Sequence, residues 1–204
     1  MPSWDEFEPY LASLRDEWDR AEEDIKRAEQ VGNQTVTPSV NELRYAGRRI
    51  VDAMHAICNG NRGDAPKLLQ DALFDCHRAR HDAIDAATSA IAVKLDITTD
   101  KLGYDPVLKA FPDYPHLLER LQKVREKIVQ SRRNRFDRNA IYATIESVDF
   151  PKLVDRYNEF QRAEPIMRGL AKRQRWVFAV TLAAGIAAIV VAILAWLFPR
   201  APTT

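Results

Sequence analysis

Apolar residues recur every three or four positions along most of the chain. In the first segment they are Leu11, Leu14, Trp18, Ala21, Ile25 and Ala28. Three later segments repeat this spacing, with the sets Leu43, Ala46, Ile50, Ala53 and Ile57; Ala72, Cys76, Ala79, Ala83, Ala86 and Ala90; and Leu117, Leu121, Val124, Ile128, Tyr142 and Ile145. Such spacing is typical of amphipathic helices that bury one face. No long stretch alternates with a period of two, so we predict an all-α fold, a cytoplasmic bundle of long helices.

Turn and capping residues suggest where these helices begin and end. Ser3 with Glu6, and Ser39 with Glu42, have the capping-box spacing and predict two helix starts. Turn-forming residues predict a loop over 59–66 and a connection over 98–115 that holds one short helix. The predicted helices cover about 3–31, 39–58, 66–97 and 115–148, with a fifth from Pro151 onwards. The small residues of the third helix favour close packing against its neighbours.

Residues 176–198 form an uncharged stretch, WVFAVTLAAGIAAIVVAILAWLF. A helix of this length measures roughly 34 Å, enough to cross a hydrocarbon layer of about 30 Å. Basic residues precede it at Arg168, Lys172, Arg173 and Arg175, whereas only Arg200 follows. The positive-inside rule therefore predicts a single-pass protein of the inner (plasma) membrane with its N-terminus in the cytoplasm. The predicted domains are a cytoplasmic helical bundle (1–150), a connecting helix (151–175), a transmembrane helix (176–198) and a short extracytoplasmic tail (199–204).

Small residues line one side of the predicted span. They are Thr181, Gly185, Ala188, Ala192 and Ala195, which we call the small-residue seam. Small side chains let helix backbones approach closely in lipid, so the seam favours a homo-oligomer, for which a tetramer is our working assumption, and it would line a pore. The alternative is an alanine-rich anchor without specific association. The register of the seam continues back to Tyr157, so the connecting helix is expected to run into the membrane unless Pro165 interrupts it.

Charge is unevenly distributed although the whole chain carries only +1. Residues 1–31 contain ten acids and four bases, and residues 119–138 contain eight bases and three acids. Ser131, Arg135 and Arg138 fall on the apolar face of the fourth predicted helix, where an arginine needs a partner. Three interpretations stay open: pairing with the acidic first helix, a solvated face, or a site for an anionic ligand. For such a ligand we predict the residues Arg125, Arg132, Arg133, Arg135, Phe136 and Arg138, with arginines on phosphates and Phe136 stacking on a base.

Few residues suggest catalysis. Arg49 and His55 have the R-x4–6-H spacing of HEPN ribonucleases, which are also all-helical; this resemblance implies RNA cleavage through the 2′-hydroxyl by two facing protomers. His77, His81 and Asp85 lie on one helix face, but without a further ligand motif they are better explained as solvated or hydrogen-bonded side chains. The two cysteines, Cys58 and Cys76, do not have the CxxC spacing of a metal-binding motif. We therefore expect no metal, no cofactor and no enzyme.

The layout of a helical cytoplasmic body, a small-residue span and almost no external mass resembles small membrane effectors of bacterial anti-phage systems, including the Hailong type. This resemblance of organisation implies a homo-oligomeric ion channel in antiviral defence, controlled by a DNA or nucleotide oligomer from a partner nucleotidyltransferase. Two alternatives stay open. One is a tail-anchored scaffold for protein interactions, and the other is a membrane-tethered HEPN-like ribonuclease that uses Arg49 and His55.

Overall fold

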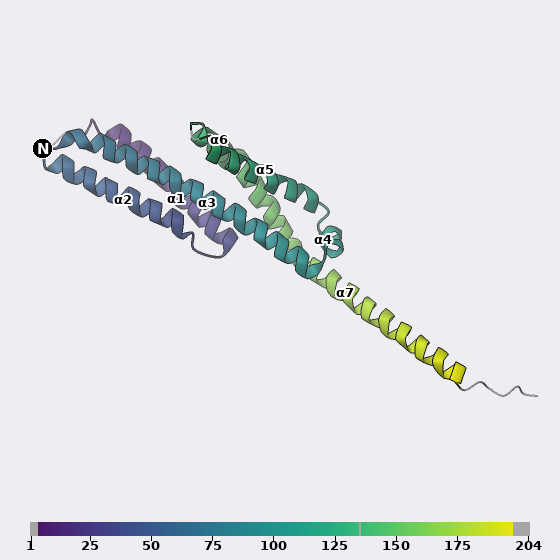
Figure 1. The fold of residues 1–204 in the computed structure, drawn as a ribbon. Coiled ribbons are helices and arrows are strands. Elements are labelled where there is room, and N and C mark those ends of the chain that lie inside the picture. Colours follow the sequence, from purple (N-terminus) through teal and green to yellow (C-terminus); the bar gives the residue numbers. More distant parts are fainter. Residues whose placement is uncertain (1–3, 135, 198–204) are drawn as a thin grey trace, which may run out of the picture. The chain divides into compact units, whose positions relative to one another are not determined.

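Every element in the described part of the chain is helical, and no strand occurs there (Figure 1). The computed structural model describes residues 4–134 and 136–197, except for the side chain of Ala195. The elements are α1 (Glu8–Gly32), α2 (Thr37–Cys58), the 3₁₀ turn η1 (Arg62–Asp64), α3 (Ala65–Leu102), α4 (Tyr104–Ala110), α5 (Tyr114–Arg133), α6 (Arg138–Thr144), the π-helical turn η2 (Ile145–Asp149) and α7 (Phe150–Leu197). The all-α prediction is confirmed, while the bundle arrangement stays a prediction.

The helix starts differ from the predicted capping boxes. Ser3 lies outside the described residues, and Glu6 accepts a hydrogen bond from Arg62 at 2.7 Å before α1 has begun. Both Ser39 and Glu42 lie inside α2, which starts earlier, at Thr37. Pro38 occupies the first turn of α2, where its missing N–H costs no helical hydrogen bond. Ser39 and Glu42 therefore have the spacing of a capping box in the sequence, but they do not stand at the N-terminus of the helix as a capping box does.

The predicted connection over 98–115 holds one short helix, as expected. The helix α3 continues to Leu102, one turn beyond the predicted end, and Gly103 follows with a φ of 88°. This left-handed backbone conformation favours glycine. It lets the chain turn directly into α4, and α5 begins four residues after α4 ends.

The predicted fourth helix is interrupted. The helix α5 ends at Arg133, and α6 begins at Arg138. In the break, the Asn134 amide donates to Asp137 Oδ2 at 2.5 Å, a local side-chain interaction of the kind that competes with helical hydrogen bonding. From Arg138 the chain stays helical through η2 into α7, which begins at Phe150, one residue before the predicted start of the fifth helix at Pro151. The π-helical turn ends two residues before Pro151, whose ring cannot supply an N–H.

The chain divides into two compact units, residues 1–97 with 115–158 and residues 98–114 with 159–204. In the first unit a continuous apolar cluster joins α1, α2 and α3; its buried members are Phe7, Leu14, Ala46, Ala53, Ile57, Ala65, Leu69, Ala72 and Cys76. In the second unit the Phe160 ring lies 5.7 Å from that of Phe111 and 5.6 Å from that of Tyr114. On the predicted small-residue face of α3, Ala72, Cys76, Ala79 and Ala83 are fully buried, whereas Ala86 and Ala90 are only half-buried.

Candidate functional site

The second half of α7 is apolar on all sides and is exposed wherever its burial is described. From Trp176 to Leu197 it contains no charged residue, and every residue whose exposure is described there is exposed. Its most apolar part has a mean hydropathy of 2.8, and it is the one helix among the described residues that is long and apolar enough to cross a membrane. These 22 residues measure roughly 33 Å, in agreement with the predicted span. Pro165 lies inside α7 without ending it.

The small-residue seam is exposed and has no neighbour among the described residues of its own unit. Thr181, Gly185, Ala188 and Ala192 are exposed, and a Cβ added at Gly185 would meet no atom within 4 Å. The side chain of Ala195 lies outside the described residues, as does Phe198 at the predicted end of the span. The seam is therefore available to a second helix, which is the condition that the predicted self-association requires.

The predicted ligand residues are divided among different environments. Arg132 donates to Asp85 Oδ2 at 2.7 Å, and the Arg138 guanidinium lies 5.8 Å from the centre of the Tyr142 ring. Arg125 and Arg133 line an open hollow of about 630 Å³ along α5. Phe136 is completely exposed, whereas Arg135 lies outside the described residues. The structure therefore brings Arg125 and Arg133 together and gives Arg132 and Arg138 partners within the fold.

Two acidic residues of α1 form hydrogen-bonded ion pairs with an arginine of α3. Among the described residues, no arginine of α5 or α6 pairs with α1; the Arg80 guanidinium instead bonds Glu17 Oε1 at 2.5 Å and Asp24 Oδ2 at 3.1 Å. A third nitrogen–oxygen contact joins Arg80 to Glu146 of η2. These four side chains form a buried charge cluster that the sequence analysis missed. The available signal was that Arg80 stands four residues from both Cys76 and Ile84, within a buried row of α3.

The cluster holds three carboxylates around one guanidinium, so their pKa values move apart. Burial raises the pKa of Glu146 to about 7 against the opposing attraction of Arg80. Burial also raises the pKa of Asp24. For Glu17 the effect of burial is overcome by hydrogen bonds from His77 and Arg80, which lower its pKa to about 2. The cluster consequently retains a proton on Glu146 for part of the time near neutral pH.

The histidines of α3 contact protein groups. His77 Nδ1 lies 2.8 Å from Glu17 Oε1, and the His81 ring stacks on Tyr142 with 3.6 Å between centroids. Asp85 accepts hydrogen bonds from Tyr142 and Arg132, each at 2.7 Å. Burial lowers the pKa of His81 to about 3, with nearby Arg138 acting in the same direction. No group of three or more potential ligand side chains among the described residues is placed to hold a metal ion.

The residues of the ribonuclease hypothesis have separate partners on the protomer. The Arg49 guanidinium bonds Asp71 at 2.8 Å and Asp75 at 2.7 Å. His55 Nε2 lies 2.8 Å from the side-chain nitrogen of Asn59 at the end of α2. The structure thus shows no contact between Arg49 and His55. A catalytic role would need both side chains to act across two protomers, and loss of RNA cleavage in His55→Ala would test it.

Three separate features are candidates for function: an exposed apolar helix with a small-residue seam, an open hollow beside two arginines that have no ion-pair partner among the described residues, and a buried charge cluster. The first suits a membrane and the second suits an anion, while the third holds a carboxyl group whose pKa is raised to about 7. No family model, characterised protein or solved structure was found that matches this chain.

Proposed function

We propose that the protein is a membrane effector whose spans associate through the small-residue seam and form an ion-conducting pore. The observation that carries this proposal is α7, a single helix from Phe150 to Leu197 that buries one face in its first half and is exposed and uncharged in its second. An exposed apolar helix of membrane length is expected to be surrounded by lipid. The basic residues before Trp176 support a cytoplasmic body.

The seam supports association of the spans. Leu182, Ile186, Ile189 and Ile193 lie on other sides of the helix, whereas the seam itself carries only small side chains. In lipid this arrangement favours close approach of helix backbones. A bore lined by Thr181 and the small residues carries no charged ring, so it would close by dewetting rather than by charge.

Ion flux through proteoliposomes that contain the full-length protein tests the pore. Gly185→Leu places bulk on the seam and is expected to abolish flux, whereas Ala183→Leu places similar bulk about half a turn away and is expected to preserve it. Equal flux in both variants would contradict a pore built on the seam. A wild-type protein that stays silent, both after nucleic acid is stripped away and after it is added back, would contradict conduction itself.

We further propose that an oligonucleotide controls the pore from the end of α5. Arg125 and Arg133 support this, because neither has an ion-pair partner among the described residues, and exposed Phe136 is free to stack on a base. With a labelled single-stranded DNA of mixed sequence, Arg125→Glu combined with Arg133→Glu should remove binding to the full-length protein. The control Arg120→Glu reverses an exposed charge elsewhere on α5 and should weaken binding far less. Equal losses would mean that α5 attracts DNA only by its general charge.

A second candidate is a tail-anchored scaffold, and the exposed face of α2 favours it. Val40, Val51 and Met54 are exposed there although they are apolar, and no described contact explains them. A face of this kind suits a partner helix. Val51→Glu with Met54→Glu would remove such docking but leave ion flux unchanged, so the two candidates are separable.

A further inference from the structure

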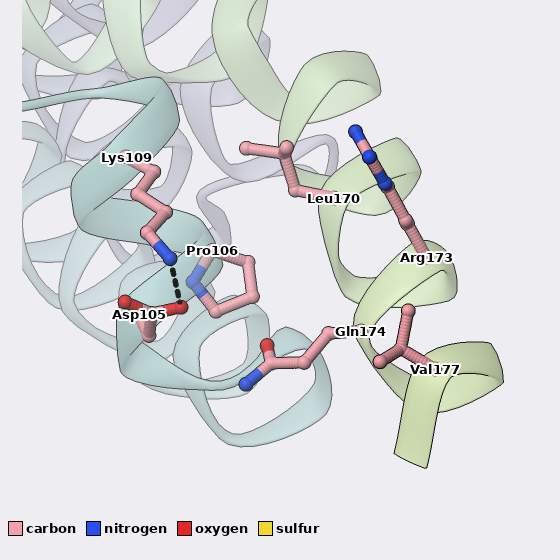
Figure 2. A pocket seen from close by; sticks show the side chains of 7 residues that line it. All are labelled: Asp105, Pro106, Lys109, Leu170, Arg173, Gln174 and Val177. Carbon is pink, nitrogen blue, oxygen red and sulfur yellow. Dashed lines mark hydrogen bonds and ion pairs between the residues drawn. The ribbon is translucent and has the colours of Figure 1, made fainter. Parts of the chain in front are cut away.

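A cavity of about 310 Å³ lies between α4 and α7 within the second unit (Figure 2). On the α4 side it is lined by Asp105, Pro106 and Lys109. Leu170 and Arg173 stand on the α7 side and, with Gln174 and Val177, complete the lining. Figure 2 shows Leu170 and Gln174 extending from α7 towards Pro106 and Asp105. The cavity therefore combines charged side chains with an apolar wall.

The charges of the cavity favour an anion. Lys109 Nζ donates to Asp105 Oδ2 at 2.8 Å, so these two charges balance one another. Arg173 is exposed and has no hydrogen-bond or ion-pair partner among the described residues. One full positive charge is left over at the edge of the cavity. A planar guanidinium binds phosphate with two parallel hydrogen bonds, and Lys109 stands on the opposite wall as a second donor.

The apolar wall leads into the span. Leu170 and Val177 are seven residues apart on α7, hence two turns apart on the same face, and Val177 belongs to the uncharged stretch that begins at Trp176. Arg173 lies between them. If α7 enters the bilayer at Trp176, the cations stand at the level of the headgroups and Val177 at the start of the acyl chains.

A hydrogen bond supports the shape of this region. The Arg175 guanidinium donates to the carbonyl oxygen of Lys101 at 2.5 Å, in the last turn of α3. This bond links α7 to the segment that leads through Gly103 into α4. It holds a basic side chain in place by a backbone contact and leaves Arg173, two residues earlier, available to a ligand.

We propose that this cavity binds the headgroup of one membrane phospholipid per protomer. The phosphate diester lies between Arg173 and Lys109, and the glycerol and first acyl carbons cover Leu170, Pro106 and Val177. Asp105, once Lys109 turns to the phosphate, accepts a hydrogen bond from the hydroxyl or ammonium end of the headgroup. This inference rests on the membrane anchoring in the proposed function but does not depend on pore formation.

Lipid retention tests the proposal. The full-length protein is taken from vesicles of phosphatidylglycerol and phosphatidylcholine into mild detergent, and bound lipid is counted by native mass spectrometry. The wild type should retain one phospholipid per protomer, and Arg173→Gln should lower retention by about tenfold or more, as expected for a charged hydrogen bond. Lys172→Gln is the matched control, because Lys172 is the adjacent cation, is exposed and does not line the cavity. Equal retention in both variants would overturn the proposal.

Two further arms identify the ligand. Leu170→Trp fills the cavity without changing its charge and should also displace the lipid, whereas unchanged retention would place the lipid elsewhere. Millimolar inorganic phosphate that fully displaces the lipid would assign the site to a free phosphate and overturn the lipid assignment. Phosphatidylethanolamine vesicles should support retention too, since the shared group is the phosphate diester.

Alkaline extraction of the same membranes separates this inference from the proposed function. If the chain stays in the membrane but retains no lipid in the cavity, only the lipid site fails. If the chain leaves the membrane, both the anchoring and the lipid site fail.

Discussion

Arg80 and Phe178 both depart from the usual rule of burial, in opposite directions. Arg80 is charged but only 9% exposed, while Phe178 is apolar and 69% exposed. In the first unit the protein supplies the missing partner, because Glu17, Asp24 and Glu146 surround the Arg80 guanidinium. None of the described residues buries Phe178, so in our proposal its partner comes from outside, from lipid and a second span. Whether one of these two side chains is buried therefore depends on whether the fold provides a partner for it.

The strongest test of this contrast introduces charge into the span. Ile189→Arg with Val190→Arg should disfavour membrane insertion by about 5–7 kcal/mol, from about 2.5–3.5 kcal/mol for each arginine near the centre of a span. The fraction that stays in the membrane after alkaline carbonate extraction measures the effect. Ile166→Arg with Gly169→Arg adds the same charge to an exposed part of α7 before the span and should leave that fraction unchanged. Retention of the span variant at the wild-type level would show that 176–197 is not the anchor.

The next test compares two phenylalanines on the same helix. Phe160 is buried against Phe111 and Tyr114, so Phe160→Ala should cost about 4 kcal/mol of unfolding free energy and lower the Tm by about 10 °C. Phe178→Ala should leave the Tm of the detergent-solubilised protein almost unchanged. Similar losses in both variants would mean that Phe178 is packed against protein.

A smaller loss is expected when the buried cation is removed. Arg80→Leu leaves three carboxylates together and should cost about 3 kcal/mol, below the upper end for a broken buried pair because the carboxylates can take up protons. Arg20→Leu is the control: Arg20 is exposed and lies 3.7 Å from Glu17, so its loss should cost about 0.5 kcal/mol. Denaturant midpoints of the full-length protein measure both. A neutral or stabilising Arg80→Leu would show that the cluster contributes specificity rather than stability.

The smallest expected effect is a pH dependence with a defined sign. The pKa of Glu146 is raised to about 7, so between its ordinary value of 4.5 and 7 the folded state holds a proton that the unfolded chain has lost. Stability should therefore fall as the pH rises through this range, by on the order of 2 kcal/mol. Glu17, whose pKa is lowered to about 2, acts in the opposite sense and loses its contribution as the pH falls below 4.5.

Glu146→Gln separates these two contributions. In a series of thermal melts from pH 4 to pH 8, the variant should lack most of the decline above pH 5 but keep the decline on the acid side. Glu119→Gln, an exposed carboxylate of α5, should keep the wild-type profile. A variant profile that still falls in the same way towards pH 7 would assign the decline to another group, with Asp24 as the first candidate because burial raises its pKa too.

Local features of the fold were predictable from the sequence. The buried faces of α1, α2 and α5 follow the predicted apolar positions, down to Ser131, which is buried and donates to the Ile128 carbonyl at 2.7 Å. Helix ends were less predictable. The helix α1 begins at Glu8 and α2 at Thr37 rather than at the predicted capping serines, and the break before Arg138 contains a hydrogen bond between Asn134 and Asp137. Each helix end reflects a competition between several local hydrogen bonds that differ little in energy.

The candidate sites were predictable only where they are single segments. The span and its small-residue seam are visible in the sequence because membrane length and helical spacing are properties of one helix. The predicted ligand set was divided because Asp85 of α3 pairs with Arg132 of α5, whereas Arg138 lies over the Tyr142 ring within α6 itself. The cavity between α4 and α7 joins Lys109 to Arg173 across 64 positions and had no signal of its own.

By itself the amino-acid sequence determined that this protein is helical and that it ends in an apolar helix of membrane length. These properties depend on neighbours within one or two turns, which periodicity records directly. Only the tertiary structure decided that Arg80 pairs with Glu17 and Asp24 of α1 and that Arg173 has no partner among the described residues. Ion pairing depends on which helices lie side by side. One and the same order of charges along the chain is compatible with many arrangements of neighbouring helices.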